Sequence, residues 1–69
     1  MRQYLRNSNG RLIGWREDGM VGRINGRDDA GRLVGWFDIA RDETRDSCGR
    51  FIGRGDLLSA LVVKGLRML

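Results

Sequence analysis

A short glycine-punctuated unit recurs along the chain and constrains its fold more than any other feature. Each copy has a small or polar residue, then Gly-Arg, two apolar residues and a second glycine. Three copies align without gaps, at Asn9–Trp15, Ala30–Trp36 and Cys48–Arg54, and a shorter fourth copy at Asp18–Arg23 lacks the arginine after its first glycine. The first glycines, at positions 10, 19, 31 and 49, give intervals of 9, 12 and 18 residues. Such spacing is too short for helical repeats and is typical of strands joined by turns.

The residue types within the unit predict turns followed by strands. Asn-Gly and Asp-Gly favour hairpin turns because they accept positive φ angles, and these dipeptides occur at 9–10, 18–19 and 25–26. One residue of each apolar pair should point into the core, because side chains alternate across a strand. The inward row consists either of Ile13, Val21, Val34 and Ile52 or of the residue before each of these. The second glycine weakens a strand interior, so its recurrence suggests a bulge or a close approach of neighbouring backbones around a centre.

These signals predict one all-β domain with a terminal helix. Strands are expected at about 2–7, 11–17, 20–25, 32–38 and 50–53, with a loop or short strand between Arg41 and Ser47. Short connections favour an antiparallel meander. We expect a single domain over residues 1–69, with the repeated hairpin units in 1–55. Four related units predict a pseudo-fourfold closure, radial or barrel-like, which would remove exposed sheet edges.

The C-terminal segment, residues 56–69, has the pattern of an α-helix. Asp56 is a favourable N-cap, and the apolar residues that follow it have helical spacing. A strand at 61–63 is the alternative, because Gly65 weakens a helix by about 1 kcal/mol relative to alanine. The apolar face is wider than a small sheet needs, and a chain of 69 residues is marginally stable by itself. We therefore expect a homo-oligomer, with an oligomer or partner interface at Leu57, Leu58, Leu61, Val62, Leu66 and Leu69.

The charged residues allow two interpretations. There are 13 basic and 9 acidic residues, giving a net charge of +4, and Lys64 is the only lysine. Arginine offers a planar fork suited to phosphates, so one interpretation is a nucleic-acid surface. It would consist of Arg11, Arg32, Arg50, Trp15 and Trp36. In the other interpretation, which we favour, the arginines pair with interleaved aspartates and the tryptophans cap the core.

The sequence lacks residues that several classes of catalytic and metal site require. It has no histidine and one cysteine, which excludes histidine-dependent triads and an intrachain disulfide and argues against a Cys/His zinc site. Cys48 is interpreted as a turn residue, and the acidic pairs Asp28-Asp29 and Asp42-Glu43 as solvated loops. We expect no enzyme activity, no metal and no cofactor. A carboxylate-based enzyme is kept as the second alternative function, after nucleic-acid binding.

The repeat resembles a known family. The units Ser8–Gly14 and Asp46–Gly53, the latter followed by Gly55–Leu61, are similar to the four-fold β-flower proteins of bacteria. In that family D-x-x-G-R-x-I-G units recur, and a G-[ND]-L-L-x-x-L segment closes the domain. The resemblance spans roughly Tyr4 to Val62. It implies a small radial β arrangement with a terminal helix, and it implies no enzyme activity and no site residues.

The functional expectation is a non-catalytic interaction module. It would self-associate and bind or inhibit a macromolecular partner, expected to be a protein, with nucleic-acid binding as the alternative. The N-terminal residues lack the apolar run of a signal peptide, and no apolar stretch reaches about 18 residues. We therefore expect a cytoplasmic location and no integral membrane segment.

Overall fold

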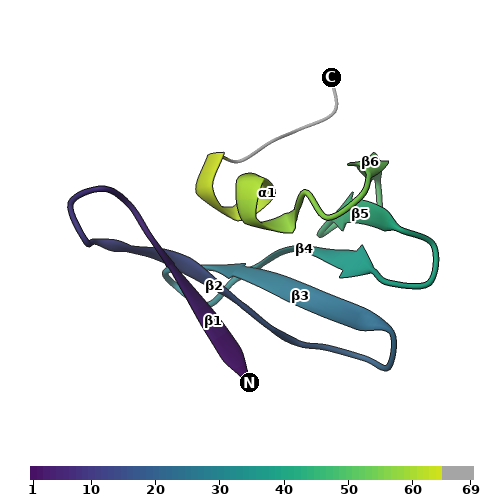
Figure 1. The fold of residues 1–69 in the computed structure, drawn as a ribbon, viewed down its shortest axis with the longest axis horizontal. Coiled ribbons are helices and arrows are strands. Elements are labelled where there is room, and N and C mark those ends of the chain that lie inside the picture. Colours follow the sequence, from purple (N-terminus) through teal and green to yellow (C-terminus); the bar gives the residue numbers. More distant parts are fainter. Residues whose placement is uncertain (65–69) are drawn as a thin grey trace.

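The chain folds into an antiparallel sheet with a helix packed across one face (Figure 1). The structure is a computed structural model that describes residues 1–64. Its elements are β1 (Arg2–Arg6), β2 (Leu12–Asp18), β3 (Arg23–Asp28), β4 (Leu33–Asp38), β5 (Glu43–Asp46), β6 (Phe51–Arg54) and α1 (Leu58–Lys64). The strands pair in chain order, each antiparallel to the next. The predicted meander with a C-terminal helix is confirmed in these terms.

Three local predictions were wrong in the segment that leads into β3. The Asn25-Gly26 dipeptide lies inside β3, with Gly26 paired to Gly35 of β4, instead of forming a turn. The strand begins at Arg23, three residues later than predicted, because residues 19–22 form the turn from β2. Val21 lies at the tip of that turn and is fully exposed, so it belongs to no inward row.

The sheet consists of three equivalent hairpins: β1–β2, β3–β4 and β5–β6. Each hairpin has one register irregularity, and in each it falls at the same position of the repeat. The residue left out of the pairing is the one before the second glycine of the unit: Ile13, Val34 or Ile52. The bulge that the recurring glycine suggested is therefore confirmed, and it bends each hairpin in the same way.

The repeat is threefold at the level of hairpins. The shorter fourth copy forms the β2–β3 turn, which lies at the opposite end of the strands from the turns of the other three copies. There Gly22 has a φ of 83° and corresponds to Gly10, so the sequence alignment of Gly19 with Gly10 was three residues out. The strand order runs from β1 to β6 without a β1–β6 pairing in the described part of the chain. The pseudo-fourfold closure is thus not observed there.

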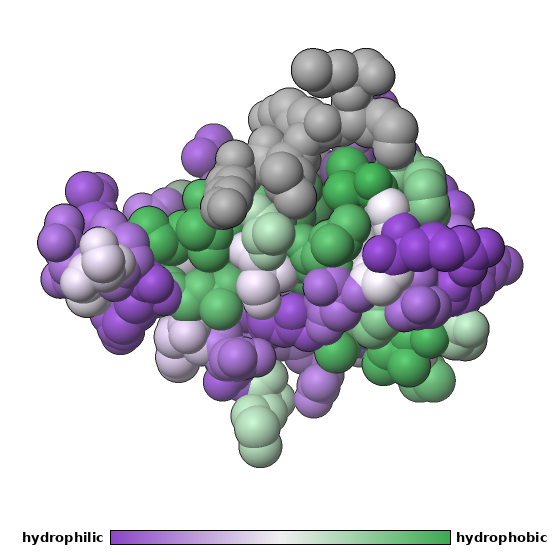
Figure 2. Space-filling view, turned by 45° about the horizontal axis from the view of Figure 1, so that its top comes forward, coloured by the Kyte–Doolittle hydropathy of each residue, from purple (hydrophilic) through white to green (hydrophobic). Residues whose placement is uncertain are grey.

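Helix α1 packs on a strip of glycines. Its core side chains Leu58, Leu61 and Val62 are between 0 and 8 % exposed. A Cβ added at Gly26 would lie 2.8 Å from Leu58 Cδ1, and one added at Gly35 would lie 2.6 Å from Leu61 Cδ2. Bare backbone therefore lets the helix approach the sheet closely, and hydrophobic residues gather along this contact (Figure 2).

Polar contacts fix the start of the helix. Asp56 Oδ1 accepts the Leu58 N–H at 3.2 Å, as an N-cap does, and Asp56 Oδ2 accepts Arg16 Nη2 at 2.6 Å. The buried Thr44 hydroxyl donates to the Gly55 carbonyl at 2.8 Å and accepts the Leu57 N–H at 2.9 Å. The segment between β6 and α1 is therefore attached to both β2 and β5.

The apolar residues assigned to a partner interface need revision. Leu58, Leu61 and Val62 are buried against the protein's own sheet, so they are not available to a partner. Leu57 is half-buried, and a Cβ at Gly53 would lie 2.6 Å from its Cδ1. Leu66 and Leu69 lie outside the described residues, as does the predicted helix beyond Lys64.

Candidate functional site

The turns that close the three hairpins share one conformation. The first residue of each turn is an asparagine or aspartate whose Oδ1 accepts the backbone N–H groups two and four residues later, at 2.9 to 3.0 Å. The fourth residue is a glycine with φ between 81° and 86°, and the fifth is an arginine. We call these segments the Asx turns: Asn7–Arg11, Asp28–Arg32 and Asp46–Arg50.

The sequence determines this conformation locally. An Asn or Asp side chain can replace a backbone carbonyl in a turn, and glycine accepts the positive φ that follows. The arginine before each turn adds a third bond, because its Nη1 donates to the carbonyl of the turn glycine. These bonds measure 3.1 Å for Arg6, 2.9 Å for Arg27 and 2.8 Å for Arg45.

These preceding arginines were missed by the sequence analysis. The signal was present, because residues 6, 27 and 45 have the same spacing as the turn glycines 10, 31 and 49. The full repeated motif is therefore Arg-[Asn/Asp]-x-x-Gly-Arg, and it begins three residues before the unit read from the sequence.

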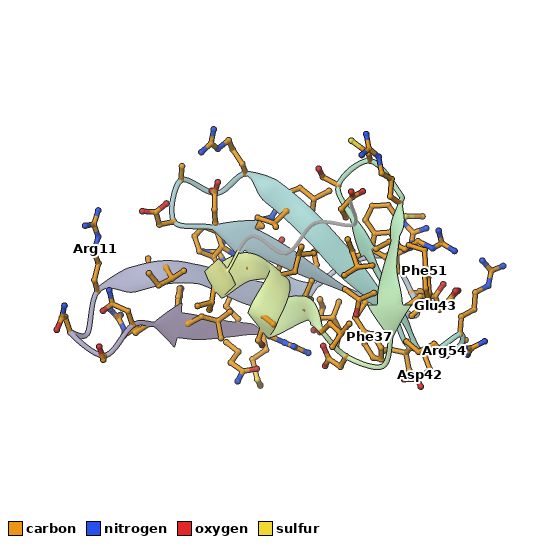
Figure 3. The ribbon with its side chains drawn as sticks, turned by 90° about the horizontal axis from the view of Figure 1, so that it is seen from above. Arg11, Phe37, Asp42, Glu43, Phe51 and Arg54 are labelled. Atoms are coloured by element: carbon orange, nitrogen blue, oxygen red, sulfur yellow. The ribbon has the colours of Figure 1, made fainter. Side chains whose placement is uncertain are left out.

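All three Asx turns lie at the same end of the strands. In a meander the β1–β2, β3–β4 and β5–β6 turns lie at one end of the strands, and the β2–β3 and β4–β5 turns lie at the other end. Arg11, Arg32 and Arg50 are exposed, and Arg11 points away from the sheet at the tip of the first hairpin (Figure 3). Residues 6–11, 27–32 and 45–50 together hold six arginines and three aspartates. We call this set of segments the arginine edge.

Part of the arginine edge is neutralised by pairing. Arg32 Nε donates to Asp28 Oδ2 at 2.9 Å, while the Arg32 side chain stays 81 % exposed. The bonds from the Arg32 and Ala30 backbone N–H groups and from the Arg32 side chain lower the pKa of Asp28, the Arg32 N–H most strongly. The first Asx turn differs, because neutral Asn7 stands where the other two carry aspartate.

The arginines that precede the turns are also paired. Arg27 Nε donates to Glu17 Oε2 at 2.9 Å, and Arg45 Nη2 lies 3.5 Å from Glu43. The Trp15 indole N–H also donates to Glu17, at 2.7 Å, and lowers the pKa of that carboxyl more than the Arg27 bond does. Of the three arginines for which pairing with an aspartate was expected, Arg32 is paired in this way, and Arg11 and Arg50 are exposed side chains.

Trp15 and Trp36 lie on the face of the sheet opposite to α1. The preceding residues, Gly14 and Gly35, face the helix, and side chains alternate along a strand. Each indole is half-buried, with a guanidinium over its ring: Arg2 at 4.8 Å from the Trp15 centroid and Arg23 at 4.5 Å from that of Trp36. One face of each ring is thus already covered by an arginine.

The tryptophans also support the Asx turns. A Cβ at Gly31 of the second turn would lie 3.6 Å from the edge of the Trp15 ring, and one at Gly49 of the third turn 3.8 Å from Trp36. Each tryptophan therefore packs against the turn of the following hairpin. The structure brings Trp15 to the turn that carries Arg32 and Trp36 to the turn that carries Arg50, while the tryptophans lie outside the core beneath α1.

The two indoles differ in their polar contacts. Trp36 Nε1 is buried without a hydrogen-bond partner among the described residues, whereas the equivalent atom of Trp15 bonds to Glu17. The residue two positions after Trp36 is Asp38, which is one methylene shorter than glutamate. Its Oδ1 accepts the Arg41 N–H at 3.2 Å instead.

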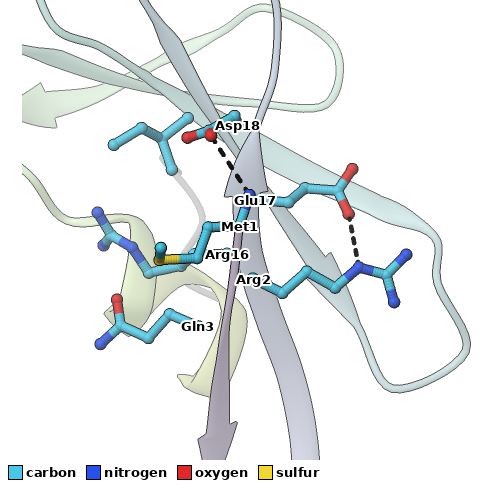
Figure 4. Close-up of a pocket in the computed structure, with 7 residues that line it drawn as sticks. Met1, Arg2, Gln3, Arg16, Glu17 and Asp18 are labelled. Atoms are coloured by element: carbon cyan, nitrogen blue, oxygen red, sulfur yellow. Dashed lines mark hydrogen bonds and ion pairs between the residues drawn. The ribbon is translucent and has the colours of Figure 1, made fainter.

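A shallow hollow of about 180 Å³ lies beside β1 and β2 (Figure 4). It is lined by residues 1–3, 16–18 and Ile24. Its charged groups pair with one another or with the helix: the Met1 ammonium lies 3.4 Å from Asp18, and Arg2 lies 3.6 Å from Glu17. These pairs engage the charged side chains of the lining, and we assign the hollow no ligand.

The remaining candidate groups fall in turns. Cys48 is exposed in the third Asx turn, where its N–H donates to Asp46 Oδ1. Asp42 has a φ of 54° in the β4–β5 turn. Within residues 1–64, no three His, Cys, Asp or Glu side chains gather in a way that could hold a metal ion.

Comparison with known proteins adds no relative to this geometry. No protein-family model, no curated protein and no solved structure matches the chain. The resemblance to the four-fold β-flower proteins stays a prediction. In the part of the chain that the structure describes, no helix has the length and apolar character needed to cross a membrane.

Proposed function

We propose that the protein is a non-catalytic binding module whose arginine edge engages an anionic macromolecule. The observation that carries this proposal is the placement of Arg11, Arg32 and Arg50 at the same position of three equivalent turns on one edge of the sheet. A guanidinium forms charge-assisted hydrogen bonds with phosphate, sulfate or carboxylate oxygens. A row of such groups matches a partner with repeated anionic groups.

The rigidity of the turns supports this function. Each Asx turn is held by two side-chain bonds and by a bond from the glycine N–H to the carbonyl of its first residue, at 2.9 to 3.0 Å. The backbone beneath each arginine is therefore fixed before binding, which lowers the entropy lost when a partner docks. Only the arginine side chains have to be ordered.

Salt dependence gives the proposal a quantitative form. Four exposed arginines, Arg6, Arg11, Arg32 and Arg50, belong to the arginine edge. Arg32 is already paired with Asp28, which leaves Arg6, Arg11 and Arg50 to neutralise three phosphates. Each neutralised phosphate of a single strand contributes about −0.7 to the slope of log K against log salt, so the slope should reach about −2. A site built on apolar contacts would give a slope near zero.

The test is a fluorescence anisotropy titration of labelled single-stranded DNA and labelled heparin over a salt series. We expect both polyanions to bind at low salt. The double variant Arg11→Gln/Arg50→Gln should lose most of the affinity, whereas Arg41→Gln/Arg54→Gln removes the same charge outside the arginine edge and should lose little. Equal losses in the two double variants, or no binding of either polyanion at low salt, would contradict the proposal.

Self-association is a second candidate property, favoured by an apolar cluster at the end of the strands opposite to the arginine edge. Met20, Val21 and Ile39 are 71, 106 and 54 % exposed, and the Ile39 N–H donates to the Gly22 carbonyl at 2.9 Å, which holds the two turns together. A second copy of this chain would bury these side chains. Sedimentation velocity should then give a dimer or larger species that Val21→Ser converts to monomer, and a wild-type monomer at micromolar concentration would exclude it.

A further inference from the structure

The second and third Asx turns show that the turn glycine is a surface on which an aromatic ring packs. The outer edge of Trp15 lies against Gly31, and that of Trp36 lies against Gly49, both at van der Waals distance from the position of a Cβ. The absence of a side chain at the glycine allows this approach. The same backbone conformation, with φ of 81° to 86°, occurs in all three turns.

The first Asx turn offers the same glycine surface without a ring on it. Within the described residues, nothing lies within 4 Å of the Cβ position at Gly10. Arg6 and Arg11 are exposed on either side of this glycine, and Arg6 Nη1 donates to its carbonyl at 3.1 Å. The turn has no carboxylate of its own, since its residues are Asn7, Ser8 and Asn9 before the glycine. The tip of this hairpin is a hydrophilic projection from the molecule (Figure 2).

These observations define the chemistry of the partner. A partner that packs on Gly10 as the tryptophans pack on Gly31 and Gly49 would supply an aromatic ring, together with anionic groups that meet Arg6 and Arg11. We propose that the first Asx turn binds one base of a single-stranded nucleic acid against Gly10, with the adjacent phosphates on the two arginines. This inference rests on the proposed function and names its partner class. A single strand is required because the bases of a duplex are stacked and not exposed.

A second copy of the chain fits this surface less well. At the position that Trp15 and Trp36 occupy in the first two hairpins, the third hairpin carries Arg54. A copy that extended the sheet in the same arrangement would bring Arg54 towards Arg6 and Arg11. Like charges placed together in an interface are repulsive, so the charge pattern favours an anionic occupant.

The test compares two labelled oligonucleotides with the same number of phosphates, an oligothymidylate and its abasic counterpart. Stacking of one base predicts about 10-fold tighter binding of the oligothymidylate by the wild-type protein. Equal affinities would overturn the base site while leaving polyanion binding intact. Failure of both oligonucleotides to bind while heparin binds would also overturn the inference, whereas failure of heparin as well would contradict the proposed function itself, so the two failures are distinguishable.

A pair of glycine variants locates the base. Gly10→Asn keeps a residue that tolerates positive φ and places a side chain where the base would pack. It should reduce the preference for oligothymidylate to less than about 2-fold without changing the abasic affinity. Gly22→Asn, at a φ of 83° and also in open space, is the matched control and should keep the full preference. A preference that survives in Gly10→Asn would place the base elsewhere and overturn the inference.

A second pair of variants avoids any strain at glycine. Asn7→Asp and Ser47→Asp each add one negative charge to an Asx turn, and each introduces the aspartate found at the equivalent position of the second turn. Asn7→Asp should weaken oligothymidylate binding several-fold more than Ser47→Asp does, since its charge lies beside Arg6 and Arg11. Equal effects of the two variants would contradict a special role for the first turn.

Discussion

The close contact between α1 and the glycine strip makes Gly35→Ala a severe test of the packing. A Cβ at this position would clash with the Arg45 carbonyl oxygen and would lie 2.6 Å from Leu61 Cδ2 and 3.0 Å from the Asp46 Cα. Two of these three atoms belong to backbone of the neighbouring strand and cannot rotate away. The added methyl must therefore push β5 from β4, lift the helix, or do both.

The magnitude follows from the number of close contacts. Overpacking a core by one methyl typically costs 1 to 3 kcal/mol, and we expect about 3 kcal/mol here because backbone has to move. A domain of this size has a total stability of only about 3 to 5 kcal/mol. Gly35→Ala should therefore remove most of the free energy of unfolding. The assay is urea denaturation followed by far-ultraviolet circular dichroism.

Two further variants separate packing from backbone conformation. Gly22→Ala has nothing within 4 Å and should cost only the strain of its positive φ, about 1 to 2 kcal/mol. The three atoms nearest to a Cβ at Gly26 belong to the side chains of Leu58 and Val62. Combining Gly26→Ala with Val62→Ala should therefore give less than the sum of the two separate costs, with a coupling of at least about 0.5 kcal/mol. A loss below about 1 kcal/mol in Gly35→Ala would refute the reasoning.

Three other predictions concern polar groups. Thr44→Val leaves the two half-buried backbone partners of the hydroxyl without this bond and should cost about 1 to 3 kcal/mol in denaturant unfolding, while Thr44→Ser should cost clearly less. Asp28→Asn keeps the side-chain oxygen that accepts the two backbone N–H groups of the Asx turn, as Asn7 does naturally, and should cost less than about 1 kcal/mol. Asp28→Ala loses both bonds and should cost about 1 to 2 kcal/mol, so equal losses in these two variants would contradict the turn geometry. The pKa values of Glu17, Asp28 and Asp56 are lowered by folding from ordinary values of 4.5, 3.8 and 3.8. Their contribution to stability is therefore complete above about pH 4.5 and lost as the pH falls through the lower folded values, so the urea midpoint should decrease below pH 4.5 and stay constant between about pH 5 and 7.

The hairpins were predictable because their signals are local. Asn, Asp and glycine specify turns by their own backbone preferences, and β-branched residues follow them, so the meander and most strand positions could be read from the sequence. The alignment of the fourth copy was wrong because Gly19 and Gly22 are both followed by plausible strand residues. The φ of Gly22 shows which glycine corresponds to Gly10, and so does the bond from the Gly19 N–H to the Arg23 carbonyl, which matches the bond from the Asn7 N–H to the Arg11 carbonyl.

The position of the helix was not predictable in the same way. Asp56 and the spacing of the leucines predict a helix, but whether Leu58 and Leu61 face a partner or the protein's own sheet depends on the surface opposite them. That surface is made of Gly14, Gly26 and Gly35, which lie on three strands and become a continuous strip only in the folded sheet. A lone glycine in a strand pattern gives no information about its neighbour on the next strand.

The candidate site was predictable in part. The matching position of Arg11, Arg32 and Arg50 within their repeated units correctly predicts their equivalence, since identical turns place them at the same end of the strands. The surroundings of the tryptophans depend on register, because the guanidinium over Trp15 comes from β1 and the one over Trp36 comes from β3. No local pattern indicates these pairs.

The most direct measurement of the central claim is a titration of the isotope-labelled protein with an oligothymidylate, followed by two-dimensional amide NMR. The arginine edge predicts that the amide signals of Gly10, Gly31 and Gly49 shift on binding, with Gly10 shifting most, while the Gly22 signal at the opposite edge stays in place. Shifts concentrated at Gly22 and its neighbours, or no shift at any of the three turn glycines with a saturating oligonucleotide, would contradict the claim.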